Sequence, residues 1–190
     1  MFLSSSSFVV QDTWLYQHTP GGRYWTESKP QVSPPHRYGH GLANVGFNKP
    51  FVVLFGGSNF TEGGGRSSPN EPENGILGDT WLLTANWASF GPPLLEWNLV
   101  PVSTAPPARM FHAMAAFDPP EGASQTIRAV MFGGCADHHC AKLLDDTWIF
   151  QGAVLGPPET PSLMNEGWNL LKQSGSSPSA RRGHAMAYVF

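Results

Sequence analysis

The sequence predicts an all-β fold, and composition, turn-forming residues and periodicity support this prediction. Of 190 residues, 41% are hydrophobic and only 13% are charged, while 21 glycines and 18 prolines supply many turns. No stretch shows a helical period over 11 residues, because Pro and Gly interrupt the longer segments. Helix is therefore expected to be a minor component.

Short elements recur along the chain at nearly constant spacing. Asp-Thr-Trp places Trp14, Trp81 and Trp148 at intervals of 67 residues. A second series begins with Pro and is spaced by 72 residues; it contains Arg37, Arg109 and Arg181, followed by His40, His112 and His184. A further tryptophan series is Trp25, Trp97 and Trp168. Self-similarity at a fixed period indicates a repeat architecture.

Two apolar runs, "FVVLF" and "RAVMF", predict strands that are buried on both faces. Each run ends in a glycine pair, Gly56-Gly57 or Gly133-Gly134, which permits positive φ angles or a close approach of neighbouring backbone.

The Asp-Thr-Trp elements predict strands in which a large indole packs between stacked sheets. Asp12, Asp79 and Asp146 precede these strands and are expected to accept hydrogen bonds from turn amides.

Four short strands per unit predict small sheets arranged radially, as in a β-propeller, because one such sheet cannot bury both faces alone. We expect strands three and four of one blade in 1–33, full blades in 34–105 and 106–177, and the first strand of a further blade in 178–190. The ring would then be incomplete, with its remaining blades in further sequence or supplied by self-association.

The ordered combination of R-x-G-H, an apolar run ending in Gly-Gly, Asp-Thr-Trp and a second Trp resembles the kelch repeat, including galactose-oxidase-like repeats. The resemblance covers nearly the whole chain. The units span about 72 residues, against about 50 in kelch repeats, and the excess falls in polar loops rich in Gly and Pro.

The resemblance implies a protein-interaction scaffold that binds a protein or peptide through inter-strand loops and the mouth of the channel. Arg37, Arg109 and Arg181 would gather at that mouth and hold acidic peptide motifs. Alternatively, each arginine bridges neighbouring blades through backbone carbonyls. The three recurring histidines are interpreted as scaffold, since residues present in every repeat usually serve the repeat.

The alternative function is the propeller domain of a metal-dependent enzyme, an oxidase or a specifier-like protein, with catalytic residues outside this sequence. The E-x3-D-x3-H pattern of specifier proteins does not occur, and no catalytic residue or cofactor is assigned. A net charge of -3 without a basic run argues against nucleic acid, and no apolar run is long enough for a membrane span. The compartment stays open, although two cysteines favour a reducing one such as the cytoplasm.

One local cluster does not belong to the repeat: Cys135, Asp137, His138, His139 and Cys140 in "CADHHC". These residue types could ligate zinc or copper. The cluster could equally be an ordinary polar turn, or a loop closed by a disulfide between the two cysteines.

Overall fold

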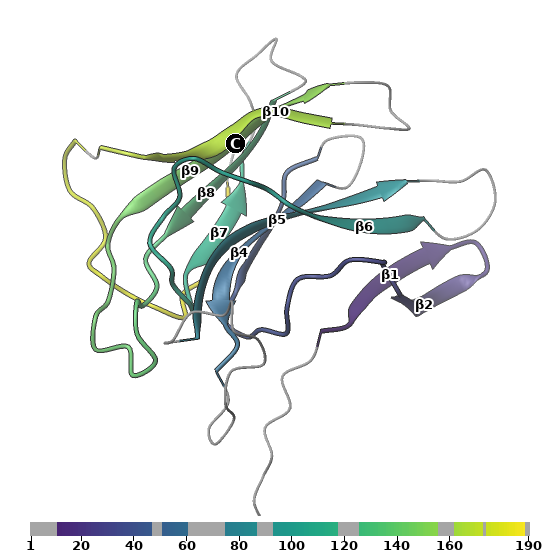
Figure 1. The fold of residues 1–190 in the computed structure, drawn as a ribbon, viewed down its shortest axis with the longest axis horizontal. Coiled ribbons are helices and arrows are strands. Elements are labelled where there is room, and N and C mark those ends of the chain that lie inside the picture. Colours follow the sequence, from purple (N-terminus) through teal and green to yellow (C-terminus); the bar gives the residue numbers. More distant parts are fainter. Residues whose placement is uncertain are drawn as a thin grey trace, which may run out of the picture.

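The computed structural model describes residues 11–46, 51–60, 75–86, 93–117, 126–155, 162–172 and 174–188. These residues form ten strands and no helix, so the predicted all-β class is confirmed (Figure 1). The strands are β1 (Thr13–Thr19), β2 (Gly22–Ser28), β3 (Gly41–Asn44), β4 (Phe51–Ser58), β5 (Ile76–Asn86), β6 (Leu94–Leu99), β7 (Ala113–Ala116), β8 (Thr126–Phe132), β9 (Thr147–Leu155) and β10 (Ser162–Leu170). Among the described residues there is accordingly no helix that could cross a bilayer.

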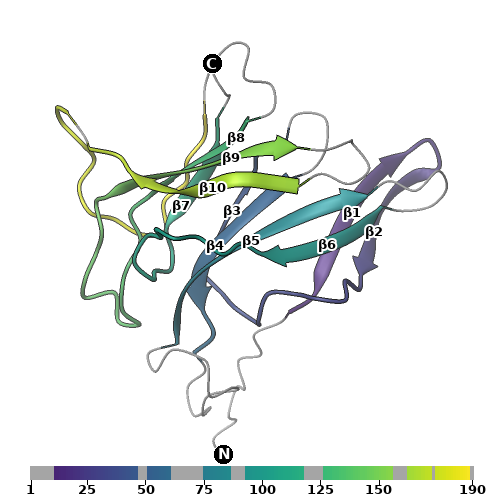
Figure 2. The ribbon, with the colours of Figure 1, turned by 45° about the horizontal axis from the view of Figure 1, so that its top comes forward.

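The strands form three antiparallel sheets in which sequence neighbours are also neighbours in space. One sheet has the order β3-β4-β5-β6, a second has the order β7-β8-β9-β10, and β1 and β2 form a hairpin. The hairpin, the first sheet and the second sheet lie side by side in chain order in both views (Figures 1 and 2). Every connection inside a sheet is therefore that of a simple meander.

Strands β4 and β8 are the second strands of their sheets, and both come from the predicted apolar runs. All residues of β4 except Val52 are buried. In β8, Ala129 and Met131 have no exposed surface. β4 is therefore covered on both faces, as predicted. In β8 buried residues alternate with partly exposed ones, so one of its faces is covered less completely than the sequence predicts.

The main core lies between the two four-stranded sheets. Trp168 on β10 packs against Phe55 on β4, with 5.1 Å between ring centroids, and against Phe150 on β9 at 5.3 Å. All three side chains are buried, together with Val53 and Met131 of the same cluster. The fourth strand of one sheet therefore covers the second strand of the preceding sheet.

The glycine pairs permit the close contact between consecutive units. Gly56 and Gly133 have φ angles of 62° and 68°, in the left-handed region that favours glycine. The amide of Gly57 donates to the carbonyl of Arg109 at 2.9 Å, and the amide of Gly134 donates to the carbonyl of Arg181 at 2.8 Å. The same backbone contact thus recurs in the next unit, 77 residues later for the glycine and 72 residues later for the arginine.

Residues 178–188, predicted to begin a further unit, contain no strand in the structure. Their backbone still docks as the equivalent residues of the preceding unit do. The amide of Arg181 donates to the carbonyl of Leu144, as the amide of Arg109 donates to that of Leu77. A strand also needs a hydrogen-bonded neighbour, and the described chain provides none for this segment.

A substitution of Gly56 tests the close approach between units. In Gly56→Ala the new Cβ would lie 2.5 Å from the carbonyl oxygen of Arg109, so the backbone must shift. We expect a loss of about 3 kcal/mol in the free energy of unfolding, measured by urea denaturation.

Gly183→Ala is the matched control, because Gly183 has a similar φ of 64° but nothing within 4 Å of a new Cβ. It should cost only about 1 kcal/mol, for the unfavourable φ alone. Equal losses in the two variants would contradict the close approach.

Candidate functional site

Arg109 is completely buried and ties the strands of its own unit together. Its Nη1 and Nη2 donate to the two carboxylate oxygens of Asp146 at 2.6 and 2.8 Å. Nη1 also donates to the carbonyl of Gly133, and Nε to that of Pro107, both at 3.0 Å. The indole of Trp148 completes the group by donating to Asp146 at 2.7 Å. We call Arg109, Gly133, Asp146 and Trp148 an Arg–Asp–Trp cluster.

The same cluster occurs in the preceding unit. Arg37 donates through Nη1 and Nη2 to Asp79, both at 2.7 Å, and through Nη1 to the carbonyl of Gly56 at 3.0 Å. Trp81 donates to Asp79 at 2.6 Å. The predicted turn-amide role of these aspartates is therefore incomplete, because their carboxylates mainly bind a guanidinium and an indole. Asp79 also lies within β5 rather than before it.

The aspartates are held in the charged form. Burial alone would raise the pKa of Asp79 and of Asp146, but the hydrogen bonds and charge of the paired arginine lower both values below the ordinary 3.8. The side chains of Arg37 and Arg109 are 3% and 0% exposed. Their guanidinium groups are thus engaged inside the units, in contrast to Arg181.

At each end of the described chain only part of the Arg–Asp–Trp cluster is present. Trp14 donates to Asp12 at 2.6 Å, as in the other units, but within the described residues no arginine reaches this exposed carboxylate. Arg181 is exposed and donates only to Ser179, through Nε at 2.9 Å and Nη2 at 3.2 Å, among the contacts of the described chain. Among the described residues, therefore, Asp12 has no arginine partner and Arg181 has no carboxylate partner.

A second repeated contact fixes the hairpin against the neighbouring sheet. The indole of Trp168 on β10 donates to Thr80 on β5 at 2.9 Å. The indole of Trp97 on β6 donates to Thr13 on β1 at 3.2 Å. Thr13 and Thr80 both precede the tryptophan of their Asp-Thr-Trp element, so β1 occupies the position toward β6 that β5 occupies toward β10.

The tryptophans of the hairpin nevertheless differ from their equivalents in exposure. Trp14 is 50% exposed and Trp25 is 63% exposed. Their equivalents are all buried: Trp81, Trp148, Trp97 and Trp168. Two strands precede β5 and β9 in their sheets, and Trp97 and Trp168 each contact a threonine of the preceding hairpin or sheet, whereas in the described chain no strand precedes β1 and β2.

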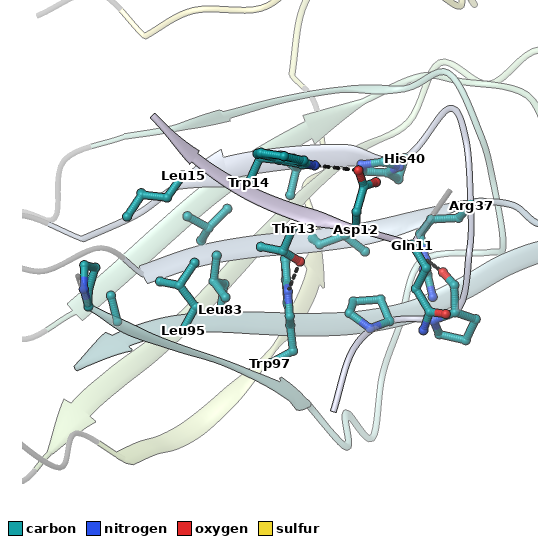
Figure 3. Close-up of a pocket in the computed structure, with 17 residues that line it drawn as sticks. Gln11, Asp12, Thr13, Trp14, Leu15, Arg37, His40, Leu83, Leu95 and Trp97 are labelled. Carbon is teal, nitrogen blue, oxygen red and sulfur yellow. Dashed lines mark hydrogen bonds between the residues drawn. The ribbon is translucent and has the colours of Figure 1, made fainter. Parts of the chain in front are cut away.

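A groove of about 390 Å³ lies between β1 and the first four-stranded sheet (Figure 3). Its apolar walls include Trp14 on β1, Leu42 on β3, Leu54 on β4 and Leu95 on β6. We call it the β1 groove. Asp12, Arg37 and His40 line it as well.

Of the three recurring histidines, His112 and His184 pack alike, and His40 differs from them. His112 lies edge-on against Phe55 at 5.7 Å between ring centroids, and His184 lies edge-on against Phe132 at 5.6 Å. Each of these phenylalanines directly precedes a glycine pair of the preceding unit. Within the described residues His40 has no such ring contact, and it faces the β1 groove instead.

The cysteine and histidine cluster forms a closed turn. Cys135 and Cys140 are joined by a disulfide. The carboxylate of Asp137 accepts hydrogen bonds from the amides of Lys142 at 2.7 Å and Ala141 at 3.0 Å, which lower its pKa. The ring of His138 contacts Phe60, and His139 is exposed. No group of three or more potential metal ligands occurs among the described side chains.

The residues that the sequence analysis selected as candidates thus have different surroundings in the structure. The structure keeps Arg37, Arg109 and Arg181 in separate units, each with its own contacts. It brings together in the β1 groove a set that the sequence did not indicate as a site. Because the hairpin carries the same repeat residues as the two complete units, nothing in the sequence indicates that its tryptophans are exposed. Neither models of known protein families nor curated proteins give a match to this chain.

Replacing the arginine of a complete cluster tests its structural role. Arg109→Met should lower the free energy of unfolding by about 3 kcal/mol, because it leaves Asp146 without its buried partner. Arg181→Met, the same change at the equivalent exposed position, should change it by less than about 0.5 kcal/mol. Chemical denaturation measures both values, and similar losses in the two variants would contradict the assignment.

His112 should make the fold sensitive to acid. Burial, followed by the charge of Arg109, lowers the pKa of His112 to about 3 from the ordinary value of 6.5. The unfolded state therefore takes up a proton before the folded state does, so stability is complete above pH 6.5 and falls as the pH is lowered toward 3.

This slope can be assigned to His112 by substitution. Between pH 6.5 and 4.5 the free energy of unfolding should fall with a slope that approaches about 1.4 kcal/mol per pH unit for this group. His112→Gln should reduce the slope over that interval, in which the paired aspartates stay ionised. Identical slopes in wild type and variant would exclude the assignment.

Proposed function

We propose that this chain is a kelch-type β-propeller segment that acts as a protein-interaction scaffold, with the β1 groove as its binding site. The repeat elements support the propeller architecture, because the two sheets have the same strand order and repeat the same tryptophan, glycine and arginine contacts. In this interpretation each four-stranded sheet is a blade, and β1 and β2 are the two outer strands of another.

The observation that carries the proposed function is the exposure of Trp14, which lines the β1 groove. In both complete units the equivalent tryptophans are buried. An aromatic side chain buries about 200 Å² when covered, so a half-exposed ring leaves about 100 Å² uncovered, worth about 2.5 kcal/mol. A half-exposed indole beside an apolar groove is typical of a protein-binding surface, where tryptophan is enriched.

The groove also differs from the site that the repeated arginines suggest. Arg37 and Arg109 would have to leave buried, bidentate ion pairs to bind an acidic peptide, and breaking such a pair costs about 3 kcal/mol or more. Burial of the apolar walls of the groove requires no such exchange. We therefore propose the groove, rather than the channel mouth, as the place of the interaction.

Two exposed leucines provide a matched test. Leu42 is 49% exposed in the β1 groove, and Leu170 is 53% exposed on β10, outside it. In affinity purification quantified by mass spectrometry, Leu42→Lys should reduce recovery of a specific protein partner by about tenfold, since a lysine on an apolar contact must be desolvated. Leu170→Lys should leave recovery unchanged.

Circular dichroism should show that both variants keep the fold of the wild type. If every associated protein is recovered equally with the two variants, the β1 groove is not the binding site.

A further inference from the structure

We infer that the turn closed by Cys135 and Cys140 is a redox-sensitive site, at which a dithiol reductant attacks Cys140 and releases the turn from its contact with the preceding unit. The turn lies between β8 and β9, and none of its residues lines the β1 groove, so it stands apart from the proposed function. The chain has no other cysteines, and the equivalent segment of the preceding unit, 58–78, contains none. The disulfide is therefore specific to one unit and is not part of the repeat.

The base of the turn is held by backbone hydrogen bonds that do not need the disulfide. The amide of Cys135 donates to the carbonyl of Met110 at 2.9 Å, and the amide of Met110 donates to the carbonyl of Cys135 at 3.0 Å. The amide of Ala136 donates to the carbonyl of Lys142 at 3.2 Å. Cys135 is completely buried, in a cluster with Ile76 and Met110. Reduction should therefore leave Cys135 and the sheets in place.

The other end of the disulfide is held less firmly. Cys140 has a φ angle of 50°, in the left-handed region that a residue with a side chain occupies only when its surroundings hold it there. Its amide donates to the carbonyl of Asp137 at 3.0 Å, and the disulfide links it to the buried Cys135. Reduction removes the covalent constraint, so the segment 137–141 should open more often.

Exposure decides which sulfur a thiol reaches first. Cys140 keeps 9% of its surface exposed, whereas Cys135 keeps none. A thiolate of the reductant attacks Sγ of Cys140 and forms a mixed disulfide with it, while Sγ of Cys135 leaves as a thiolate and takes up a proton.

The second thiol of the reductant completes the exchange. It attacks the reductant's own sulfur in the mixed disulfide, and Sγ of Cys140 leaves and takes up a proton. The protein disulfide thereby gains two electrons and two protons, and the dithiol is oxidised to a disulfide.

The turn contacts the preceding unit through an aromatic pair that reduction should weaken. The ring centroid of His138 lies 4.3 Å from that of Phe60, which follows β4. Both ring nitrogens of His138 are buried and have no hydrogen-bond partner among the described residues, so within that part of the chain packing positions the ring. Phe60 is 42% exposed. When the turn opens, His138 leaves Phe60, and the surface that the two units present beside the turn changes.

Hydrogen exchange followed by NMR tests the release of the turn in the full chain. The amides of Ala141 and Lys142 donate to the carboxylate of Asp137 at 3.0 and 2.7 Å. Dithiothreitol, the dithiol used as the probe, should make both amides exchange at least about tenfold faster, because a short closed loop becomes an open one. The amides of Met110 and Cys135, at the base of the turn, should exchange at the same rate in both redox states.

The contact between the two units is the second measurement. Nuclear Overhauser effects between the rings of His138 and Phe60 should be present in the oxidised chain, lost on reduction and restored on reoxidation. Cys140→Ala, which cannot form the disulfide, should behave as the reduced wild type does, with or without dithiothreitol. Circular dichroism should show that all these forms keep the wild-type fold.

The single-cysteine variants test the direction of attack. The free thiol of Cys140 in Cys135→Ala should react with dithionitrobenzoate at least about tenfold faster than the free thiol of Cys135 in Cys140→Ala, because thiol reactivity follows access. Mapping the mixed disulfide that limiting glutathione forms with the wild-type chain gives the same assignment without a substitution at the buried position.

Three results would each overturn the redox site. The first is a disulfide that dithiothreitol reduces only when the whole chain unfolds. The second is equal exchange of the Ala141 and Lys142 amides in the oxidised and reduced chains. The third is a glutathione adduct on Cys135 instead of Cys140.

Discussion

The bidentate pair between a buried arginine and the aspartate of Asp-Thr-Trp is the interaction on which the rest of the structure depends. Arg109 precedes β7, Gly133 follows β8, and Asp146 and Trp148 lie at the start of β9, so one guanidinium fixes three strands relative to one another. A buried cation without its partner is strongly unfavourable. The pair therefore couples the first two strands of each four-stranded sheet to the last two.

The same constraint explains why the two ends of the described chain differ from its middle. A unit with both strand pairs encloses its arginine, buries its tryptophans and covers the next histidine. In the described chain the β1–β2 hairpin has only the counterpart of the last two strands of a sheet, so Asp12 and Trp14 are exposed and His40 lines the β1 groove. Trp25 is exposed because no described sheet precedes the hairpin. Arg181 shows the complementary condition, because no strand pair equivalent to β9 and β10 follows it in the described chain. The β1 groove thus arises where a unit of the described chain has one strand pair instead of two.

The sequence predicted the strands well because their signals are local. Apolar runs such as "FVVLF" end at glycine pairs, and β4 and β8 form there as interior strands. The function of Asp79 could not be predicted in the same way, since Arg37 lies 42 residues away and only the sheet brings the two together. Likewise, the motif around Trp14 matches that around Trp81, yet exposure depends on a neighbouring strand pair that no local pattern encodes. The Cys135–Cys140 disulfide was only one of several open alternatives, because spacing alone does not fix the path of a loop.

A double-mutant cycle between Arg109 and Asp146 tests the central claim most directly. Arg109→Met, Asp146→Asn and the combination are compared by their free energies of unfolding. If the pair couples the strands of a unit, the two single losses will exceed the combined loss by about 2 kcal/mol or more. The cycle between Arg181 and Asp146, which are not in contact, provides the zero. Additivity within about 0.5 kcal/mol for Arg109 and Asp146 would contradict the account.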